Sequence, residues 1–223
     1  MADFKHWQAD DLKGLLNLLV GHYYGTDPIT QLDTIKQTKF HESQNITQSL
    51  SLTEEDRVID LGAGCGFIAE HIAPKVVHLD CVDISESFLK YNRLVNKHNS
   101  NIDYYNIPFA DMSTVPKATA IYSVAVFIHF NLYDCYLYLQ QCYNCLEDNG
   151  RLWFDFLNDQ MLDTTADRWQ HHTTRYLKDR TATFTNVHYN SVTALCALAR
   201  QIGFDLEQTH NENDHTFFLL RKH

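Results

Sequence analysis

A glycine-rich segment that follows an apolar run is the part of the sequence best suited to bind a ligand. Residues Arg57–Leu61 read Arg-Val-Ile-Asp-Leu, and Gly62-Ala-Gly-Cys-Gly66 follows at once. Glycine lets a backbone turn tightly and approach a ligand closely, and a strand, a glycine loop and a helix in succession form a cofactor loop in open parallel sheets. The segment therefore predicts a nucleotide-type cofactor site at the carboxyl end of the first strand.

The spacing of the glycines bears on which cofactor is bound. Dinucleotide loops read G-x-G-x-x-G, which places a pyrophosphate on the helix N-terminus. Here the third glycine, Gly66, comes one residue early, and Asp60 stands two residues before Gly62. A carboxylate at that place disfavours a pyrophosphate and suits a ligand that carries an ammonium group and a sulfonium. A second acid, Asp83, ends the next predicted strand about twenty residues after the loop, where it can accept hydrogen bonds from ribose hydroxyls.

Strand-like and helical patterns alternate from residue 57 onward. The strand-like runs are Arg57–Leu61, Val76–Val82, Ile102–Asn106, Ala120–Phe127, Arg151–Phe156, Phe204–Thr209 and Thr216–Leu220. The helical patterns are Phe67–Ala73, Glu86–His98, Leu132–Leu146 and Ser191–Ile202. This alternation predicts an α/β fold, a doubly wound parallel sheet covered by helices on both faces. Too few residues separate the last two strands for a parallel crossover, so we expect an antiparallel hairpin there.

The first 50 residues have a helical pattern instead. Four leucines, Leu12, Leu15, Leu16 and Leu19, recur at helical spacing, and a weaker helical stretch covers about residues 40 to 50. We expect an N-terminal helical cap over residues 1–44 and a single α/β domain over residues 45–223.

Composition limits the classes of partner. The chain of 223 residues has 18 Lys and Arg against 28 Asp and Glu, a net charge of −10. Such a chain repels phosphate backbones and anionic lipid surfaces, so nucleic acid and membrane partners are disfavoured. No apolar run reaches the roughly 18 residues that are needed to span a bilayer. The N-terminal residues also lack the pattern of a signal peptide. We expect a cytoplasmic protein, in which the six cysteines are reduced thiols.

Taken in order, these segments resemble the class I S-adenosylmethionine-dependent methyltransferases, in the broad group that acts on small molecules. The resemblance covers about residues 45–223 and is carried by Asp60–Gly66, Val82–Ser85, Phe109–Met112, Tyr122–Phe130, Leu146–Phe154 and Ala199–Phe204. It implies a Rossmann-like sheet of seven strands in the order 3-2-1-4-5-7-6, with strand 7 antiparallel. The implied reaction moves a methyl group from S-adenosylmethionine to an O or N atom of a small organic acceptor and leaves S-adenosylhomocysteine.

The resemblance also implies how the first two strands contact the cofactor. The glycine loop, with Gly62, Ala63, Gly64 and Gly66, lies against the methionine part and the ribose. Asp60 helps to hold the amino group, and Asp83 takes the ribose hydroxyls. Ile84 lies against the adenine.

Further cofactor contacts are implied after the third and fourth strands. Asp111 receives the adenine amino group, and Met112 packs near the ring. Val126, Phe127 and His129 lie beside the cofactor at the end of the fourth strand. His129 has two interpretations: a general base for a hydroxyl or amine substrate, or a hydrogen-bonded histidine at a strand end.

The acceptor pocket is expected from the variable, aromatic-rich parts of the chain. Its predicted residues are Tyr23, Tyr24, Trp169 and Arg175. No metal site is expected, because Cys135, Cys142 and Cys145 share one side of a predicted helix without a partner pair of ligands. Two alternatives remain: a catalytically silent methyltransferase-like binding module, and an NAD(P)-dependent oxidoreductase, against which Asp60 and the early third glycine argue.

Overall fold

The computed structural model describes residues 11–19, 28–160, 170, 173–174, 176–177, 187–212 and 215–223. The chain divides into two compact units, Met1–Phe109 and Ala110–His223, called here the N-terminal and the C-terminal unit. Within the described residues, no helix is both long enough and apolar enough to cross a membrane.

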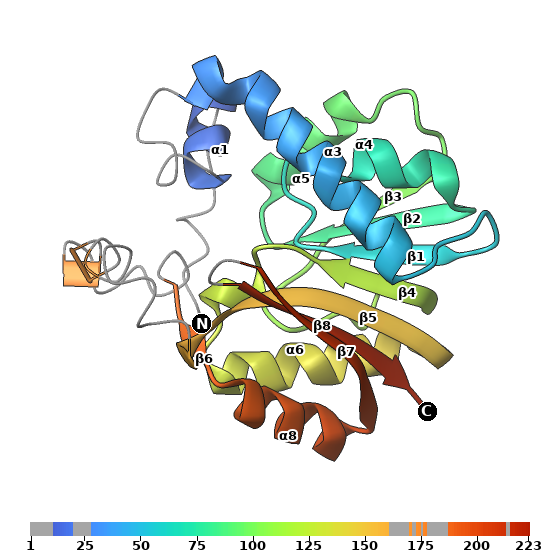
Figure 1. Ribbon diagram of the computed structural model, residues 1–223. Coiled ribbons are helices and arrows are strands. Elements are labelled where there is room, and N and C mark those ends of the chain that lie inside the picture. Colours follow the sequence, from blue (N-terminus) through green and yellow to red (C-terminus); the bar gives the residue numbers. More distant parts are fainter. Residues whose placement is uncertain are drawn as a thin grey trace. The chain divides into compact units, whose positions relative to one another are not determined.

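The N-terminal unit is built on three parallel strands (Figure 1). They are β1 (Arg57–Leu61), β2 (His78–Asp83) and β3 (Ile102–Asn106), with β2 in the middle. Short apolar runs produce these strands, and β1 and β2 are buried except at their first residues. The segments between them form α4 (Ala69–Ile72), η3 (Ala73–Lys75) and α5 (Glu86–Val95). The side chain of Ser85 accepts a hydrogen bond from the N–H of Phe88 and so caps the start of α5.

In the described part of the N-terminal segment, the helical elements α1 (Leu12–Leu19), η2 (Pro28–Gln31) and α3 (Leu32–Ser49) precede this sheet. Leu15, Leu16 and Ile35 form one buried cluster with Cys65, Phe67 and Phe88. Leu15 and Leu16 of α1 therefore share this cluster with Cys65 of the glycine loop and with Phe67 directly after it. α3 is longer than the predicted stretch of 40 to 50, and it runs without a break through residue 44, so the division of the chain at that residue stays a prediction.

The C-terminal unit is a mixed sheet. Its strands are β4 (Ala118–Ser123), β5 (Leu146–Asn158), β6 (Tyr189–Asn190), β7 (Phe204–Glu212) and β8 (His215–Lys222). β5 pairs in parallel with β4 and β6 and antiparallel with β8, which pairs antiparallel with β7. The predicted terminal hairpin is therefore confirmed. The helices with described bounds in this unit include η4 (Phe127–His129), α6 (Leu132–Cys145) and α8 (Val192–Ile202).

Aromatic side chains fill the core of the C-terminal unit. Phe127 lies 4.3 Å from Phe154 between ring centroids, and Phe218 packs edge-on against both Phe154 and Phe156. All four rings are fully buried. Alternation along β5 and β8 places these residues on one face of the sheet.

The strand order is β3-β2-β1-β4-β5-β8-β7, with the two-residue β6 beside β5. The predicted α/β fold and its order are thus confirmed, apart from β6, which is too short to leave a pattern in the sequence. The predicted strand Ala120–Phe127 was wrong at its end, since β4 stops at Ser123. Ala125 has a φ of 56°, which breaks the extended backbone, and the apolar residues beyond it pack as the short helix η4.

Candidate functional site

The glycine loop turns sharply at the end of β1. Gly62, Gly64 and Gly66 have φ angles of 79°, 51° and 82°, a region that favours glycine. The N–H groups of Gly62 and Ala63 donate hydrogen bonds of 2.8 and 3.1 Å to the carbonyl of Val82 in β2. The loop therefore folds back onto the end of β2.

Asp83 joins the last residue of β2 to this loop. Its carboxylate accepts hydrogen bonds of 2.8 Å from the N–H of Gly64 and 2.8 Å from the N–H of Ser85. The side chain is buried, and burial raises the pKa of Asp83 to about 6, although the backbone N–H donors act in the opposite direction. A carboxylate with this little water around it is suited to accept further hydrogen bonds from a ligand.

Two buried asparagines, Asn92 in α5 and Asn96 directly after its last residue, support the glycine loop. Asn92 donates to the carbonyl of Gly64 at 3.4 Å, and Asn96 donates to the carbonyl of Gly66 at 3.0 Å and to Asn92 Oδ1 at 2.9 Å. A Cβ atom on Gly66 would overlap with both side chains. Sequence reasoning missed these two residues. Their i, i+4 spacing on a helix of otherwise apolar buried positions is the signal that would have found them.

The remaining predicted residues of the N-terminal unit lie beside the loop. Asp60 is buried in β1, where it is the register partner of Cys81 in β2. Ile84 follows Asp83 directly and is half-buried. The N-terminal unit thus brings Asp60, the glycine loop, Asp83 and Ile84 to the carboxyl ends of β1 and β2, where open α/β sheets bind ligands.

In the C-terminal unit, the predicted adenine contacts precede β4. Asp111 is exposed, and hydrogen bonds from Ser113 lower the pKa of its carboxyl group. Met112 is fully buried, and its N–H donates to Gln141 Oε1 of α6 at 3.1 Å. Asp111 therefore carries a charge available to a ligand, whereas Met112 is fixed against α6.

The residues predicted at the end of β4 lie in and before η4. Val126 is half-buried, and its carbonyl accepts a hydrogen bond of 2.9 Å from the N–H of His129, which is also half-buried. Phe127 is fully buried, with its ring in the aromatic core. Of these three residues, Val126 and His129 retain surface that a ligand can contact. The predicted acceptor-pocket residues Tyr23, Tyr24, Trp169 and Arg175 lie outside the described residues.

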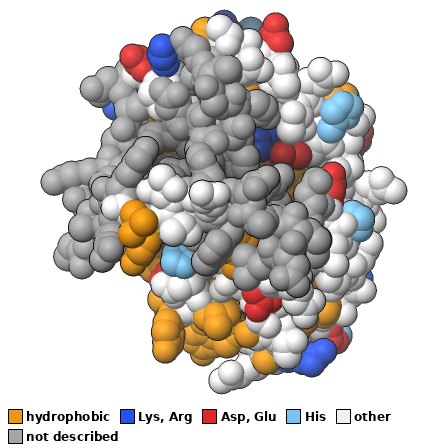
Figure 2. All heavy atoms as spheres, turned by 60° about the vertical axis from the view of Figure 1, so that its left-hand side comes forward, with side chains coloured by type: hydrophobic (Ala, Val, Ile, Leu, Met, Phe, Trp, Pro, Cys, Tyr) orange, Lys and Arg blue, Asp and Glu red, His pale blue; other side chains and the backbone are white. Residues whose placement is uncertain are grey.

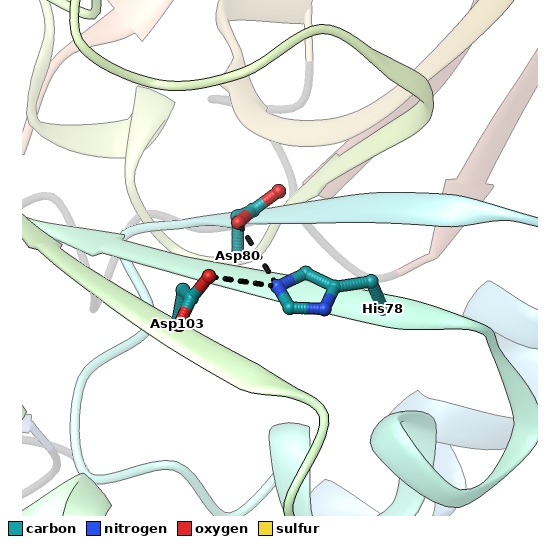
Figure 3. Close-up of side chains that lie close together, drawn as sticks. All are labelled: His78, Asp80 and Asp103. Carbon is teal, nitrogen blue, oxygen red and sulfur yellow. Dashed lines mark ion pairs between the residues drawn. The ribbon is translucent and has the colours of Figure 1, made fainter.

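A histidine and two aspartates of the N-terminal unit lie close enough to share a metal ion (Figure 3). His78 Nε2 is 3.5 Å from Asp80 Oδ1 and 3.2 Å from Asp103 Oδ2. Arg57 already donates to both oxygens of the buried Asp80, at 2.7 Å each. The group stands at the amino ends of its strands, away from the end where such sheets bind ligands. We therefore interpret it as an ion-pair network that stabilises the sheet.

Neither the cysteines nor the basic residues form a recognisable site among the described residues. Cys135, Cys142 and Cys145 are buried on α6, and burial raises the pKa of all three thiols, that of Cys145 to about 11. On the face drawn in Figure 2, the Lys and Arg side chains of the described part are scattered.

Comparison with known proteins bears on the family. A search of curated proteins finds no match, but a family model described as a methyltransferase domain matches residues 34–209. A Bacillus halodurans C-125 protein, named as a proposed methyltransferase, is 14% identical with a TM-score of 0.67, over 82% of this chain and 99% of that chain.

Two further structures are similar at the level of the fold. The N-methyltransferase NodS of Bradyrhizobium japonicum WM9, in complex with S-adenosylhomocysteine, is 15% identical with a TM-score of 0.65, over 93% of this chain and 98% of that chain. The magnesium protoporphyrin IX methyltransferase of Synechocystis PCC 6803, with the same ligand bound, is 15% identical with a TM-score of 0.61, over 84% of this chain and 83% of that chain. Since the family model covers most of the sequence, the chain belongs to the methyltransferase-domain family.

Proposed function

We propose that this protein transfers a methyl group from S-adenosylmethionine to an oxygen or nitrogen atom of a small organic acceptor. The observation that carries the proposal is the bond between Gly64 and Asp83. It fixes a sharply turned glycine loop against a buried carboxylate at the carboxyl ends of β1 and β2. The cytoplasmic location and the small-molecule partner expected from the sequence belong to the same proposal.

The residues of the N-terminal unit fit this cofactor. Asp83 is an acceptor for ribose hydroxyls, and Ile84 offers an apolar surface for adenine. Asp60 is a carboxylate for the amino group, and the loop glycines have no side chains that would keep a ligand from the backbone. Bound S-adenosylmethionine supplies a methyl group already activated by the positive charge on sulfur. The protein then needs chiefly to orient the acceptor and exclude water, effects that contribute about 7–11 kcal/mol in favourable cases.

Two named neighbours, an N-methyltransferase and a magnesium protoporphyrin IX methyltransferase, were solved with S-adenosylhomocysteine. Both structures support the choice of cofactor. An N-methyltransferase and an O-methyltransferase family protein of Burkholderia thailandensis are both among the similar structures, so the proposal keeps oxygen and nitrogen acceptors. Asp111, Met112, Val126 and Phe127 stay predicted cofactor residues of the C-terminal unit.

Calorimetric titration with S-adenosylhomocysteine, S-adenosylmethionine and NADH tests the cofactor. We expect the titration to detect binding of the first two ligands only. In a separate thermal unfolding measurement, each of these two should raise Tm by about 5–10 °C at a hundredfold excess over Kd. Asp83→Ala should abolish most of this binding. Asp103→Ala is the matched control, because Asp103 lies on the neighbouring strand near its amino end and is exposed. Binding of NADH alone would overturn the proposal.

Turnover is tested by release of S-adenosylhomocysteine with a panel of phenols, aliphatic alcohols and amines. Methylation of any member supports an enzyme. Tight cofactor binding without turnover on any member favours the silent binding module instead.

A further inference from the structure

A buried carboxylate and a histidine of the C-terminal unit form a close pair that sequence reasoning missed. Asp155 Oδ2 of β5 lies 2.6 Å from His215 Nδ1 of β8. The carboxylate of Asp155 is 2% exposed, and the His215 ring is 21% exposed. The pair therefore combines a shielded anion with an imidazole that reaches the surface of its unit.

The second oxygen of Asp155 is also engaged. Asp155 Oδ1 accepts a hydrogen bond of 2.6 Å from the N–H of Ala125, in the turn that follows β4. Because the carboxylate is an acceptor, the ring nitrogen that faces it, Nδ1, must carry the proton. In the neutral ring, Nε2 then holds the lone pair and is the basic nitrogen.

The pair lies toward the carboxyl ends of β4 and β5, the end at which open α/β sheets bind ligands. β4 ends at Ser123, whose register partner on β5 is Phe154. Asp155 is the next residue of β5, and His215 is the register partner of Leu157. Both groups thus lie just past the carboxyl end of β4, and Asp155 bonds to the residue directly before Val126.

Neighbouring contacts hold His215 in place. Its ring stacks on Phe217 with 6.3 Å between centroids, and Phe217 stacks on Trp153 at 5.0 Å. The next residue, Thr216, is buried and accepts a hydrogen bond of 3.0 Å from Asn158. An imidazole fixed in tautomer and orientation by a carboxylate is the arrangement found in general-base catalysis.

We propose that His215 is the general base of the methyl transfer and that Asp155 is its positioning residue, so that the acceptor carries a transferable proton on a hydroxyl or an amine. This inference rests on the proposed function and narrows it. Acceptors that need no base, such as carboxylates and tertiary amines, are excluded as the principal substrates.

The step balances without a further reactant. As the acceptor O or N forms its bond to the methyl carbon, the carbon–sulfur bond breaks and its electron pair stays on sulfur. The acceptor proton passes to His215 Nε2, and the resulting imidazolium, paired with Asp155, releases it to water.

The test uses the full chain labelled with ¹⁵N-histidine, with the His215 signals assigned by their loss in His215→Asn. Long-range ¹H–¹⁵N correlation is recorded at a pH where the ring is neutral, with saturating S-adenosylhomocysteine. We expect a protonated Nδ1 and an unprotonated Nε2. In Asp155→Asn the amide oxygen of the new side chain must accept from the N–H of Ala125, so its NH₂ group faces Nδ1 of His215. We therefore expect the other tautomer in this variant, with the proton on Nε2. A proton on Nε2 in the unsubstituted protein overturns the proposal.

Accessibility is tested on the same samples with diethyl pyrocarbonate, which modifies an unprotonated, reachable ring nitrogen. We expect carbethoxylation of His215 in the unsubstituted protein and its loss in Asp155→Asn. His210→Gln, which removes an exposed histidine of β7, should leave the His215 modification unchanged. An unreactive His215 in the unsubstituted protein also overturns the proposal, since a general base must be reachable.

The two proposals fail in different ways. If S-adenosylhomocysteine does not bind, the proposed function is wrong whatever the tautomer. If it binds while Nε2 carries the proton, the cofactor assignment stands and the assignment of the base is wrong.

Discussion

The N–H of Gly64 donates a hydrogen bond of 2.8 Å to the buried carboxylate of Asp83. This bond joins two residues 19 positions apart, one in the glycine loop and one at the end of β2. The same carboxylate is the proposed acceptor for the ribose hydroxyls. Loop geometry, local stability and cofactor affinity therefore depend on the protonation state of one side chain.

Asp83 should make stability depend on pH in an unusual direction. Its pKa is about 6 in the folded protein against an ordinary 3.8, so between about pH 4 and 6 the folded state binds the proton more tightly than the unfolded state. The stabilising contribution is present below this window and is lost as the pH rises through it, by at most about 3 kcal/mol. Urea unfolding of the unsubstituted protein and Asp83→Asn at several pH values isolates this effect. The variant should gain in relative stability from pH 4.5 to 7, and a constant difference would contradict the prediction.

Cofactor affinity should show the opposite trend with pH. Ribose hydroxyls donate to the carboxylate, so binding requires Asp83 to lose its proton. The Kd for S-adenosylhomocysteine should be constant above pH 6 and rise by about tenfold per pH unit below it. Calorimetry across this range tests the expectation. Asp83→Asn should bind weakly at every pH with a flat profile, and a matching pH dependence in that variant would assign the effect to another group.

Asn92 should matter for binding although it is buried behind the loop. Asn92→Ala removes the bonds to Gly64 and Asn96, so the loop keeps only the bond from Asn96 to the carbonyl of Gly66. We expect a Kd for S-adenosylhomocysteine about tenfold higher, equivalent to about 1.4 kcal/mol. Lys90→Ala, on the exposed side of the same helix, is the control and should leave Kd unchanged. Equal effects of the two substitutions would show that helix stability, not loop support, is being measured.

The sequence was sufficient for the parts of the fold that leave local patterns. Alternating apolar runs predicted β1, β2 and β3, and the short gap between the last two strands predicted their antiparallel pairing. The end of β4 was missed because Val124 and Val126 have high strand propensity, while the positive φ of Ala125 depends on tertiary contacts such as its bond to Asp155.

Side-chain pairs that depend on the register of two strands could not be predicted from sequence patterns. Asp155 and His215 are 60 residues apart, and they meet only because β8 pairs antiparallel with β5 in one particular register. A shift by one residue would put His215 on the opposite face of the sheet. The i, i+4 spacing of Asn92 and Asn96 places both residues on one side of a helix, but the fold alone brings them to their partners, the carbonyls of Gly64 and Gly66.

Arg57 should be important for stability and not for binding. Arg57→Gln leaves the fully buried Asp80 without its two guanidinium bonds. Because Arg57 itself is about one-third exposed, we expect a loss of about 2–3 kcal/mol, below the usual 3–5 for a buried pair. Lys39→Gln, which breaks a more exposed pair on α3, should cost about 0.5 kcal/mol. Urea unfolding measures both, and an equally small loss for Arg57→Gln would mean that Asp80 is neutral or otherwise compensated.

The two candidate bases of the C-terminal unit, His215 and His129, can be separated by kinetics with any acceptor that the panel identifies. His215→Asn keeps an N–H donor for Asp155 but has no basic nitrogen, so kcat should fall by about 10²–10⁴-fold while KM changes little. His129→Asn should retain most of its kcat, because general-base action needs an oriented imidazole and the proposal assigns that role to His215, which is oriented by Asp155. The sequence-based assignment of His129 as the base predicts the reverse. A large loss of kcat in His129→Asn with little change in His215→Asn would therefore restore His129 and leave the Asp155–His215 pair as a structural contact.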